Sequence, residues 1–264
     1  MFNKNLVFLT KKNFQIFEIE NFLDENLYNN LKINFPLANE IDFIRSQESV
    51  SREKKFSFNN FNKREELYTE CMSNNKAMQE FHNIIHSEEF FYFFYSKMLR
   101  YFLKNNSYSM KRTLKLLGFP KLTEKYTKTT IRNFFYSKFF VRIEYSYILN
   151  GGKVVPHTDL PGKLLSLMLY FPDNDPLYED NQEEAFGTQF WDCNISNADN
   201  IHYRDEEEIK FLNNPEHLRT FKIKYKSNQL SGFARSPYAW HSADPIIFHE
   251  NYIRKSININ FFQA

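Results

Sequence analysis

The second half of the chain is a series of short runs rich in aromatic, β-branched and other apolar residues, separated by turn-forming residues. Such runs predict strands, and a succession of them without intervening helices indicates a β-sandwich or jelly roll. Asn150-Gly151-Gly152 predicts a turn after the first run. We expect strands at 139–149, 163–171, 186–191, 220–226, 229–234 and 254–262.

The first half shows mainly helical spacing. A strand-like run at 14–22 is followed by a predicted helix with Asp24 as its N-cap and Pro36 as its stop. Residues 63–104 alternate apolar and polar positions at helical spacing, and Ser87 with two following glutamates favours a helix start. One face of that helix is aromatic, and we interpret it as core packing rather than a cofactor site. It comprises Phe90, Phe94, Met98 and Tyr101.

No linker rich in Pro or Gly, internal repeat or low-complexity tract divides the chain. We therefore expect one α+β domain over 1–264. In this interpretation residues 1–137 form a mostly helical support, and residues 138–264 form the β core that carries the functional site.

The composition is that of a globular protein with an unusual share of aromatic rings. The 264 residues include 30 Phe and 16 Tyr, which predicts a core and clefts lined with rings. Lys and Arg total 34 and Asp and Glu total 32, so the net charge of +2 argues against nucleic acid as a partner. With only Cys71 and Cys193, a disulfide framework is excluded and a reducing compartment is favoured.

The sequence predicts no signal peptide and no membrane span. The N-terminal apolar run LVFL is too short for a signal peptide. The apolar segment 90–103 is interrupted by Lys97 and Arg100. We expect a soluble, cytoplasmic protein, and the sequence leaves its oligomeric state open.

Candidate chemistry begins in VVPHTDLPGK, residues 154–163. In a strand, residues i and i+2 share a face, so His157 and Asp159 can converge on one ion. Taken alone, the pair fits a solvated loop end better than a metal site. A third ligand from a later strand therefore decides between the two interpretations.

Among the seven histidines, His241 has the context expected of that third ligand. It follows the strand-like QLSGFA and stands thirteen residues before Arg254. The others fit elsewhere: His82 and His86 in the helical region, His202 and His217 in a polar insertion (192–218) interpreted as a solvated excursion, and His249 in a loop.

The last predicted strand carries a polar stripe. Its apolar face is made of Ile257, Ile259 and Phe261, and its polar face of Arg254, Ser256, Asn258 and Asn260. Unpaired buried polar groups cost about 1–3 kcal/mol each, so this stripe needs partners. A guanidinium and a hydroxyl directed into a barrel suit a ligand carboxylate, because Arg binds carboxylates in a bidentate, charge-assisted way.

Two histidines and one carboxylate on one face of an octahedral ion leave three positions open, as in non-haem Fe(II) oxygenases. Zinc usually takes four tetrahedral ligands and would not explain the Arg-x-Ser pair. A 2-oxo acid can occupy two open positions through its 1-carboxylate and keto oxygen. The last position is then left for dioxygen.

From about residue 139 to the end, the chain resembles the Fe(II)/2-oxoglutarate-dependent dioxygenase superfamily, in particular its prolyl-hydroxylase-like branch. The family pattern H-x-D, distal His and R-x-S is matched by His157-x-Asp159, His241 and Arg254-x-Ser256. Flanking segments are similar as well: EYSYILNGGKVVPHTD, SLMLYF, AFGTQFW (Gly-Thr where the family has Gly-Gly), NQLSGFARSPYAWHSADP and, more weakly, NFLDENLYNNLKINFP.

The resemblance implies a double-stranded β-helix (jelly roll) with packed helices mainly from the N-terminal half. It implies that His157, Asp159 and His241 bind Fe(II) and form the catalytic centre. It further implies that Arg254 and Ser256 hold the distal carboxylate of 2-oxoglutarate. Tyr170 and Tyr147 match positions of cosubstrate tyrosines in the family, with core packing as the alternative for both.

The implied reaction consumes 2-oxoglutarate and O2, releases succinate and CO2, and hydroxylates a substrate C–H bond or removes a methyl group. The presence of Asp159 disfavours the halogenating variant, which lacks this carboxylate. A jelly roll that binds metal without turnover is an alternative, which the Arg-x-Ser strand disfavours. A zinc hydrolase is another, although no HExxH-type helix is present.

The substrate class stays open among small molecules, sugars and peptidyl side chains. The acidic segment 173–185 would favour a cationic substrate if it formed a lid, although a solvated loop is the simpler interpretation. Arg142 and Arg235 would suit an anionic substrate, and pairing at the surface explains them equally well.

Overall fold

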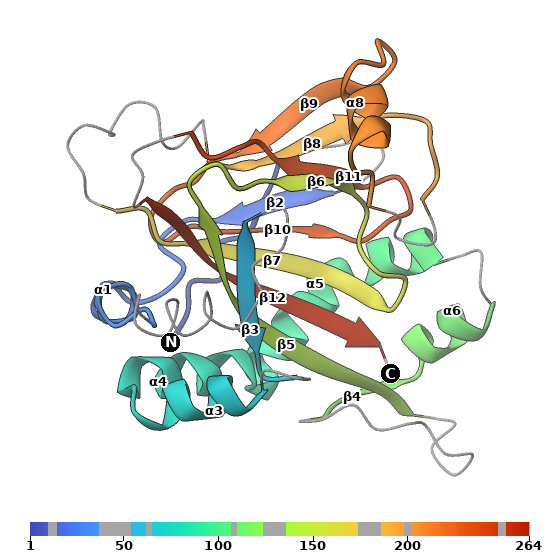
Figure 1. The fold of residues 1–264 in the computed structure, drawn as a ribbon. Helices are drawn as coiled ribbons and strands as arrows, with labels where there is room; N and C mark the ends of the chain where they lie inside the picture. Colours follow the sequence, from blue (N-terminus) through green and yellow to red (C-terminus); the bar gives the residue numbers. More distant parts are fainter. Residues whose placement is uncertain are drawn as a thin grey trace.

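A computed structural model describes most of the chain (Figure 1). The described residues are 1–9, 15–36, 54–61, 65–106, 110–123, 136–173, 186–197, 202–247 and 252–263. Within them the chain is an α+β protein with two β-sheets and six helices. Among these helices, none is long and apolar enough to cross a membrane.

The large sheet has eight strands and is antiparallel apart from one pair. Along the sheet its order is β1 (Val7–Phe8), β2 (Ile16–Ile19), β10 (Leu230–Ala234), β7 (Lys163–Tyr170), β12 (Ile253–Gln263), β5 (Tyr136–Leu149) and β3 (Lys55–Asn59). The eighth strand, β4 (Phe119–Leu122), pairs with β5 in parallel.

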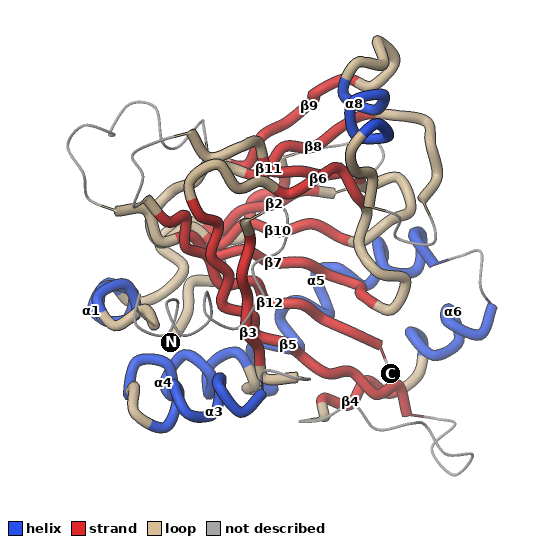
Figure 2. Tube along the Cα trace, in the orientation of Figure 1, coloured by secondary structure: helices blue, strands red, loops and turns tan. Residues whose placement is uncertain are grey.

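The small sheet has four strands and lies on one side of the large one (Figure 2). Its order is β6 (Val154–His157), β11 (Trp240–Ala243), β8 (Thr188–Asp192) and β9 (Leu218–Ile223). Rings from the two sheets meet between them, as where Phe190 of β8 lies 5.1 Å from Phe233 of β10. We call this apolar layer between the sheets the inner core.

Helices cover the opposite face of the large sheet. They are α1 (Glu25–Ile33), α3 (Glu65–Ser73), α4 (Lys76–Ile85), α5 (Glu88–Asn106) and α6 (Met110–Leu117). Phe90, Phe94 and Met98 of α5 are fully buried against the sheet, as in the contact of Phe90 with Phe261 of β12. The aromatic face of this helix is therefore core packing, as expected, and we call this layer the outer core.

Local sequence signals account for the helix ends. The Asp24 carboxylate accepts hydrogen bonds from the backbone N–H groups of Asn26 and Leu27 and caps α1. The Ser87 hydroxyl accepts one from the N–H of Phe90 at the start of α5. Both predicted starts are confirmed.

Several predicted strands are confirmed, and the structure adds others. Predicted runs became β2, β5, β7, β8, β9, β10 and β12 with shifted ends, whereas β1, β3, β4, β6 and β11 were not predicted as strands. The expectation of no helix among the late strands is wrong, because α8 (Glu206–Leu212) lies between β8 and β9. The mainly helical first half also supplies four strands of the large sheet.

The alternation of β12 between the two cores positions the site. Ile257, Ile259 and Phe261 belong to the outer core. The polar residues Arg254, Ser256, Asn258 and Asn260 line a cavity between the sheets. The polar stripe predicted for this strand is thus confirmed, and its partners are the residues of the cavity.

Gly187, just before β8, provides a test of packing beside the site. A Cβ added there would lie 1.7 Å from the carbonyl oxygen of Ile223 in β9, so Gly187→Ala must push two neighbouring strands apart. We expect it to lower the free energy of unfolding by about 1–3 kcal/mol, measured by urea denaturation. Gly162→Ala is the matched control, because its nearest atom would be 3.9 Å away. Equal stability of the two variants would contradict this account.

Candidate metal centre and cosubstrate pocket

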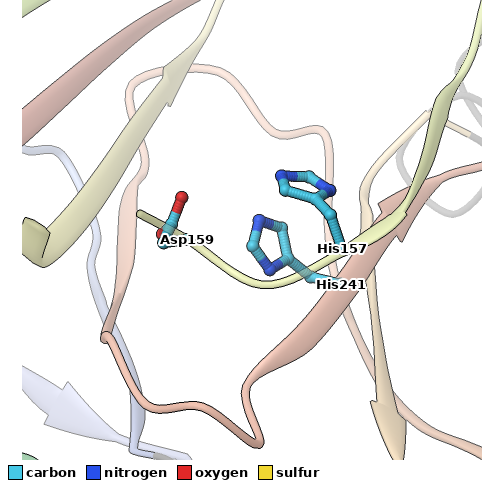
Figure 3. Close-up of side chains that lie close together, drawn as sticks. All are labelled: His157, Asp159 and His241. Carbon is cyan, nitrogen blue, oxygen red and sulfur yellow. The ribbon is translucent and has the colours of Figure 1, made fainter. Parts of the chain in front are cut away.

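Neighbouring strands bring the two histidines of the motif together. His157 ends β6 and His241 lies directly opposite it in β11. Asp159 follows two residues later in the loop after β6 and points toward the same space (Figure 3). The ligand atoms of the three residues lie within 4.8 Å of one another, a separation that one metal ion can bridge. Among the described residues, this is the cluster that could hold a metal ion.

Backbone carbonyl groups fix the orientation of both imidazole rings. His157 Nδ1 lies 2.9 Å from the carbonyl oxygen of Val155, and His241 Nδ1 lies 3.0 Å from that of Ala239. A carbonyl oxygen can only accept, so each Nδ1 carries the proton. Each Nε2 therefore presents its lone pair, the arrangement of a histidine ligand oriented by a second hydrogen bond.

The third candidate ligand, Asp159, is a buried carboxylate with a partner on each oxygen. Lys163 Nζ lies 2.6 Å from Oδ1, and the Ser166 hydroxyl donates to Oδ2 at 2.5 Å. Burial alone would raise the pKa of Asp159, but the charges of Lys163, His241 and His157 outweigh it and lower that pKa. The group is ionised at neutral pH, as metal binding requires.

The two histidines are neutral under the same conditions. Burial lowers the pKa of His157 well below its usual value, and the neighbouring His241 and His202 lower it further. Burial also lowers the pKa of His241, against the opposing effect of Asp159. Two neutral imidazoles and one carboxylate give a ligand set that suits a divalent cation.

The sequence indicated that the insertion 192–218 is a solvated excursion. In the structure, described residues of this insertion instead pack beside the candidate ligands. The His202 ring stacks on His157 with centroids 4.5 Å apart and planes 17° apart. His217 is buried, and its Nδ1 lies 2.9 Å from the carbonyl oxygen of Phe211 in α8. Phe211 in turn packs on Trp240, the neighbour of His241. The insertion thus covers the histidine side of the site.

Arg254 lies in the same cavity as the three candidate ligands. Its side chain is buried and its guanidinium lies 5.0 Å from the Tyr170 ring centre and 5.3 Å from that of Tyr225. Its Nε donates a hydrogen bond to the carbonyl oxygen of Phe186 at 2.5 Å. These contacts hold a cation in an aromatic environment between the sheets. The neighbouring Ser256 is also buried and lines the cavity.

The two tyrosines predicted from the resemblance lie on opposite faces of the large sheet. Tyr170 belongs to the inner core beside Arg254, and its hydroxyl lies 2.8 Å from Thr188 Oγ1. Tyr147 belongs to the outer core, where its hydroxyl donates to the carbonyl oxygen of Pro36 at 2.8 Å. The prediction of Tyr147 as a cosubstrate residue is therefore wrong. On β5 the even-numbered side chains, such as Ser146, face the cavity, and Tyr147 has the opposite parity.

Sequence reasoning missed Tyr225, which completes the aromatic wall around Arg254. Its hydroxyl lies 3.1 Å from the carbonyl oxygens of Phe171 and Lys255. Tyr225 stands just after β9, and no local motif distinguishes it from the many other tyrosines of the chain. Only the packing of β9 against the large sheet reveals its position.

The two arginines considered for substrate binding are not surface ion pairs. Arg142 lines the cavity and pairs with Glu144 on the same face of β5. Arg235 is buried, and its Nε donates to the backbone carbonyl oxygen of Asp159 at 3.2 Å. Arg235 thus supports the loop that carries one candidate ligand.

His82 and His86 belong to the helical layer. His86 is the C-cap of α4 and its ring stacks on His82, with centroids 4.1 Å apart, away from the three ligands. His249 and residues 174–185 lie outside the described part of the chain. Asp173, at the start of the acidic segment, pairs with Lys255 at 2.9 Å.

The hydrogen bond from Ser166 provides a test of how the carboxylate is held. Ser166→Ala removes one donor to Asp159, and we expect the affinity for Mn(II) to fall about 10- to 100-fold, as for other groups that orient metal ligands. Titration followed by electron paramagnetic resonance measures the affinity. Ser146→Ala is the control, because Ser146 lines the same cavity from β5. If the two variants bind Mn(II) equally well, Ser166 does not orient the ligand.

The chain matches no protein-family model and no curated protein. Among solved structures it is similar to a prolyl-4-hydroxylase from Pseudomonas putida, with 11% identity over 94% of this chain and 92% of that one, at a TM-score of 0.43. It is also similar to the epimerase SnoN in complex with Fe3+, alpha ketoglutarate and nogalamycin RO, with 10% identity, 94% and 79% coverage and a TM-score of 0.42.

A third similar structure is a prolyl hydroxylase from Trichoplax adhaerens in complex with a hypoxia inducible factor peptide fragment. Identity is 11%, coverage is 94% of this chain and 83% of that one, and the TM-score is 0.39. The function proposed below rests on the residues of the chain itself. In its motifs the chain resembles the Fe(II)/2-oxoglutarate-dependent dioxygenase superfamily, and prolyl hydroxylases are among the solved structures similar to it.

Proposed function

We propose that the protein is an Fe(II)- and 2-oxoglutarate-dependent dioxygenase that hydroxylates a C–H bond of a small-molecule, sugar or peptidyl substrate. One observation carries the proposal: two imidazole Nε2 atoms, one carboxylate and a buried arginine share a single cavity between two sheets. A protein that only stores a metal needs the two imidazoles and the carboxylate, but not the arginine. The buried arginine suits a ligand that binds the metal at one end and carries a carboxylate at the other.

The strand order supports a double-stranded β-helix as the fold of this protein. From β5 to β12 the chain passes to the small sheet and back repeatedly, so that β5, β12, β7 and β10 face β6, β11, β8 and β9. Eight antiparallel strands in two facing sheets of four are the pattern of a jelly roll. In this proposal 1–264 form one domain, with β1 to β4 and the helices built around the jelly roll of 138–264.

The ligand set fits iron better than a structural zinc. The ligand atoms of three residues converge, and the same residues line a cavity that can admit further ligands. A closed zinc site would take a fourth protein ligand. When bound by His157, Asp159 and His241, Fe(II) with 2-oxoglutarate and O2 would supply the oxidising power, and the cosubstrate would leave as succinate and CO2.

In this reaction the protein would bind the cosubstrate and keep water away from the groups that bind it. Arg254 would bind the distal carboxylate of 2-oxoglutarate, with Ser256 and Tyr170 as neighbouring hydroxyl donors. The rings of Tyr170 and Tyr225 exclude water around the guanidinium, which strengthens a charged hydrogen bond. Asp159 would remain ionised through Lys163 and Ser166 until the metal binds.

The function is tested by absorption spectroscopy under anaerobic conditions. We expect Fe(II) and 2-oxoglutarate together to give a weak metal-to-ligand charge-transfer band in the visible region, and His157→Ala to abolish it. His86→Ala is the control, because His86 lies outside the cavity. Tight retention of zinc without any such band would favour the alternative, a jelly roll that binds metal without turnover.

Arg254→Ala tests the cosubstrate clamp separately from the metal site. Loss of a buried charged hydrogen bond costs about 1.5–3 kcal/mol, so we expect roughly 10- to 100-fold weaker binding of 2-oxoglutarate. Calorimetric titration of the Mn(II)-loaded protein measures it, and Mn(II) binding should persist. Lys255→Ala is the matched control, since Lys255 lies next to Arg254 but pairs with Asp173. Unchanged affinity in Arg254→Ala would place the carboxylate elsewhere.

A further inference from the structure

The cavity that holds the candidate metal ligands has two cations, Arg142 and Lys163, at the end away from Arg254. We propose that the primary substrate carries an anionic group, a carboxylate or a phosphate, and that Arg142 and Lys163 bind it. This inference rests on the proposed function, because it concerns what enters the cavity after the metal and 2-oxoglutarate.

The charges that line the cavity do not balance. Among the described residues the cavity has four cationic side chains and two carboxylates, which leaves a net charge of +2. The charges of Fe(II) and of the 2-oxoglutarate dianion cancel. The excess positive charge of the cavity would therefore remain after both had bound. The cations are Lys55, Arg142, Lys163 and Arg254, and the carboxylates are Glu144 and Asp159.

Arg254 is buried and the other three cations are half-buried, and an excess of positive charge away from bulk water is costly unless an anion compensates it. Burial lowers the pKa of Lys55; Glu144 opposes this effect, and Lys163 and Arg254 lower the pKa further. For Glu144, burial alone would raise the pKa, but Lys55 and Arg142 outweigh it and lower that pKa, so this carboxylate is ionised. Bringing an anion into the cavity would relieve the repulsion among the cations.

The register of the strands places Arg142 where a substrate would need it. Arg142 lies opposite Asn260 of β12, and Asn260 lies opposite Ser166 of β7, the residue that donates to Asp159. Two strand spacings separate Arg142 from Ser166, about 10 Å. An anionic group at Arg142 would therefore lie beside the metal centre without coordinating it, and the rest of the substrate would lie between the two.

Arg142 also has donor capacity to spare. Its ion pair with Glu144 uses a terminal nitrogen, while Nε is buried and has no hydrogen-bond partner among the described residues. Asn258 and Asn260 line the same wall of the cavity and offer neutral donors. Arg254, six residues from Asn260 along β12, lies about 20 Å away at the other end of the strand face and is left for 2-oxoglutarate.

Lys163 becomes available once a metal is present. The Lys163 ammonium group lies 2.6 Å from Asp159 Oδ1 and neutralises that carboxylate. If Asp159 bound a divalent cation, that cation would compensate the carboxylate and would repel the ammonium group. Lys163 can then turn to a second anion, so metal binding is expected to favour binding of an anionic substrate.

The test uses protein loaded with Mn(II) and saturated with 2-oxoglutarate, in which no turnover occurs. The probes are inorganic phosphate, acetate and methylammonium, and the readout is paramagnetic relaxation of their 31P or 13C nuclei. We expect faster relaxation of the anions, at a distance from the metal that is longer than a coordination bond. The anion that binds more tightly, phosphate or acetate, indicates whether the substrate group is a phosphate or a carboxylate.

Two substitutions that change the charge of the cavity in opposite directions test the role of Arg142. Arg142→Gln should weaken anion binding at least tenfold, and Glu144→Gln should tighten it, because the second variant removes a negative charge from the same wall. Lys153→Gln is the control: it also removes one positive charge, but Lys153 pairs with Glu208 outside the cavity. If Arg142→Gln fails to fold, Glu144→Gln still decides the question.

Several outcomes would overturn the proposal. Enhanced relaxation of methylammonium would indicate a cationic substrate, as the acidic segment 173–185 would favour. Relaxation of phosphate at bonding distance from Mn(II), or no response to either substitution, would also contradict it. Binding of Mn(II) and 2-oxoglutarate is measured first in the same samples: its failure would contradict the proposed function, whereas its success without anion binding would contradict this inference alone.

Discussion

The structure depends on the opposite character of the two faces of the large sheet. Along β12 the side chains that face the helices are apolar, and those that face the small sheet are polar or charged. Burial of the apolar face against α5 and its neighbours stabilises the fold, since each fully buried large apolar side chain contributes about 1.5–3 kcal/mol. The other face can then carry groups that would be unfavourable in a core.

Charge compensation keeps that polar face stable between two sheets. Lys163 and Ser166 satisfy both oxygens of Asp159, and Arg142 pairs with Glu144. Buried charges are tolerated when they are paired and hydrogen-bonded, and breaking such a pair is strongly destabilising. In the functions proposed above, these pairs would prepare the site for a divalent cation, and the positive charge of the cavity as a whole would favour an anion.

Support around the candidate ligands comes from distant parts of the chain. Arg235 holds the backbone of Asp159, carbonyl groups orient both histidines, and the insertion that contains α8 stacks His202 on His157. A site held in this way is pre-organised, because its ligands lose little freedom when the metal binds. The insertion is therefore part of the site, although its sequence is polar and acidic.

Local patterns in the sequence determined much of this protein: the caps of α1 and α5, most of the strands after residue 138, and the two-residue periodicity that places Arg254 and Ser256 on one face. They also indicated His157, Asp159 and His241, which the structure brings within reach of one ion. The tertiary structure alone decided which face of β5 meets the cavity, and therefore that Ser146 lies inside it and Tyr147 outside. It also decided that His202 and Tyr225 belong to the site region. The physical reason is that periodicity groups residues on a face, whereas the packing of the sheets and helices selects what that face meets.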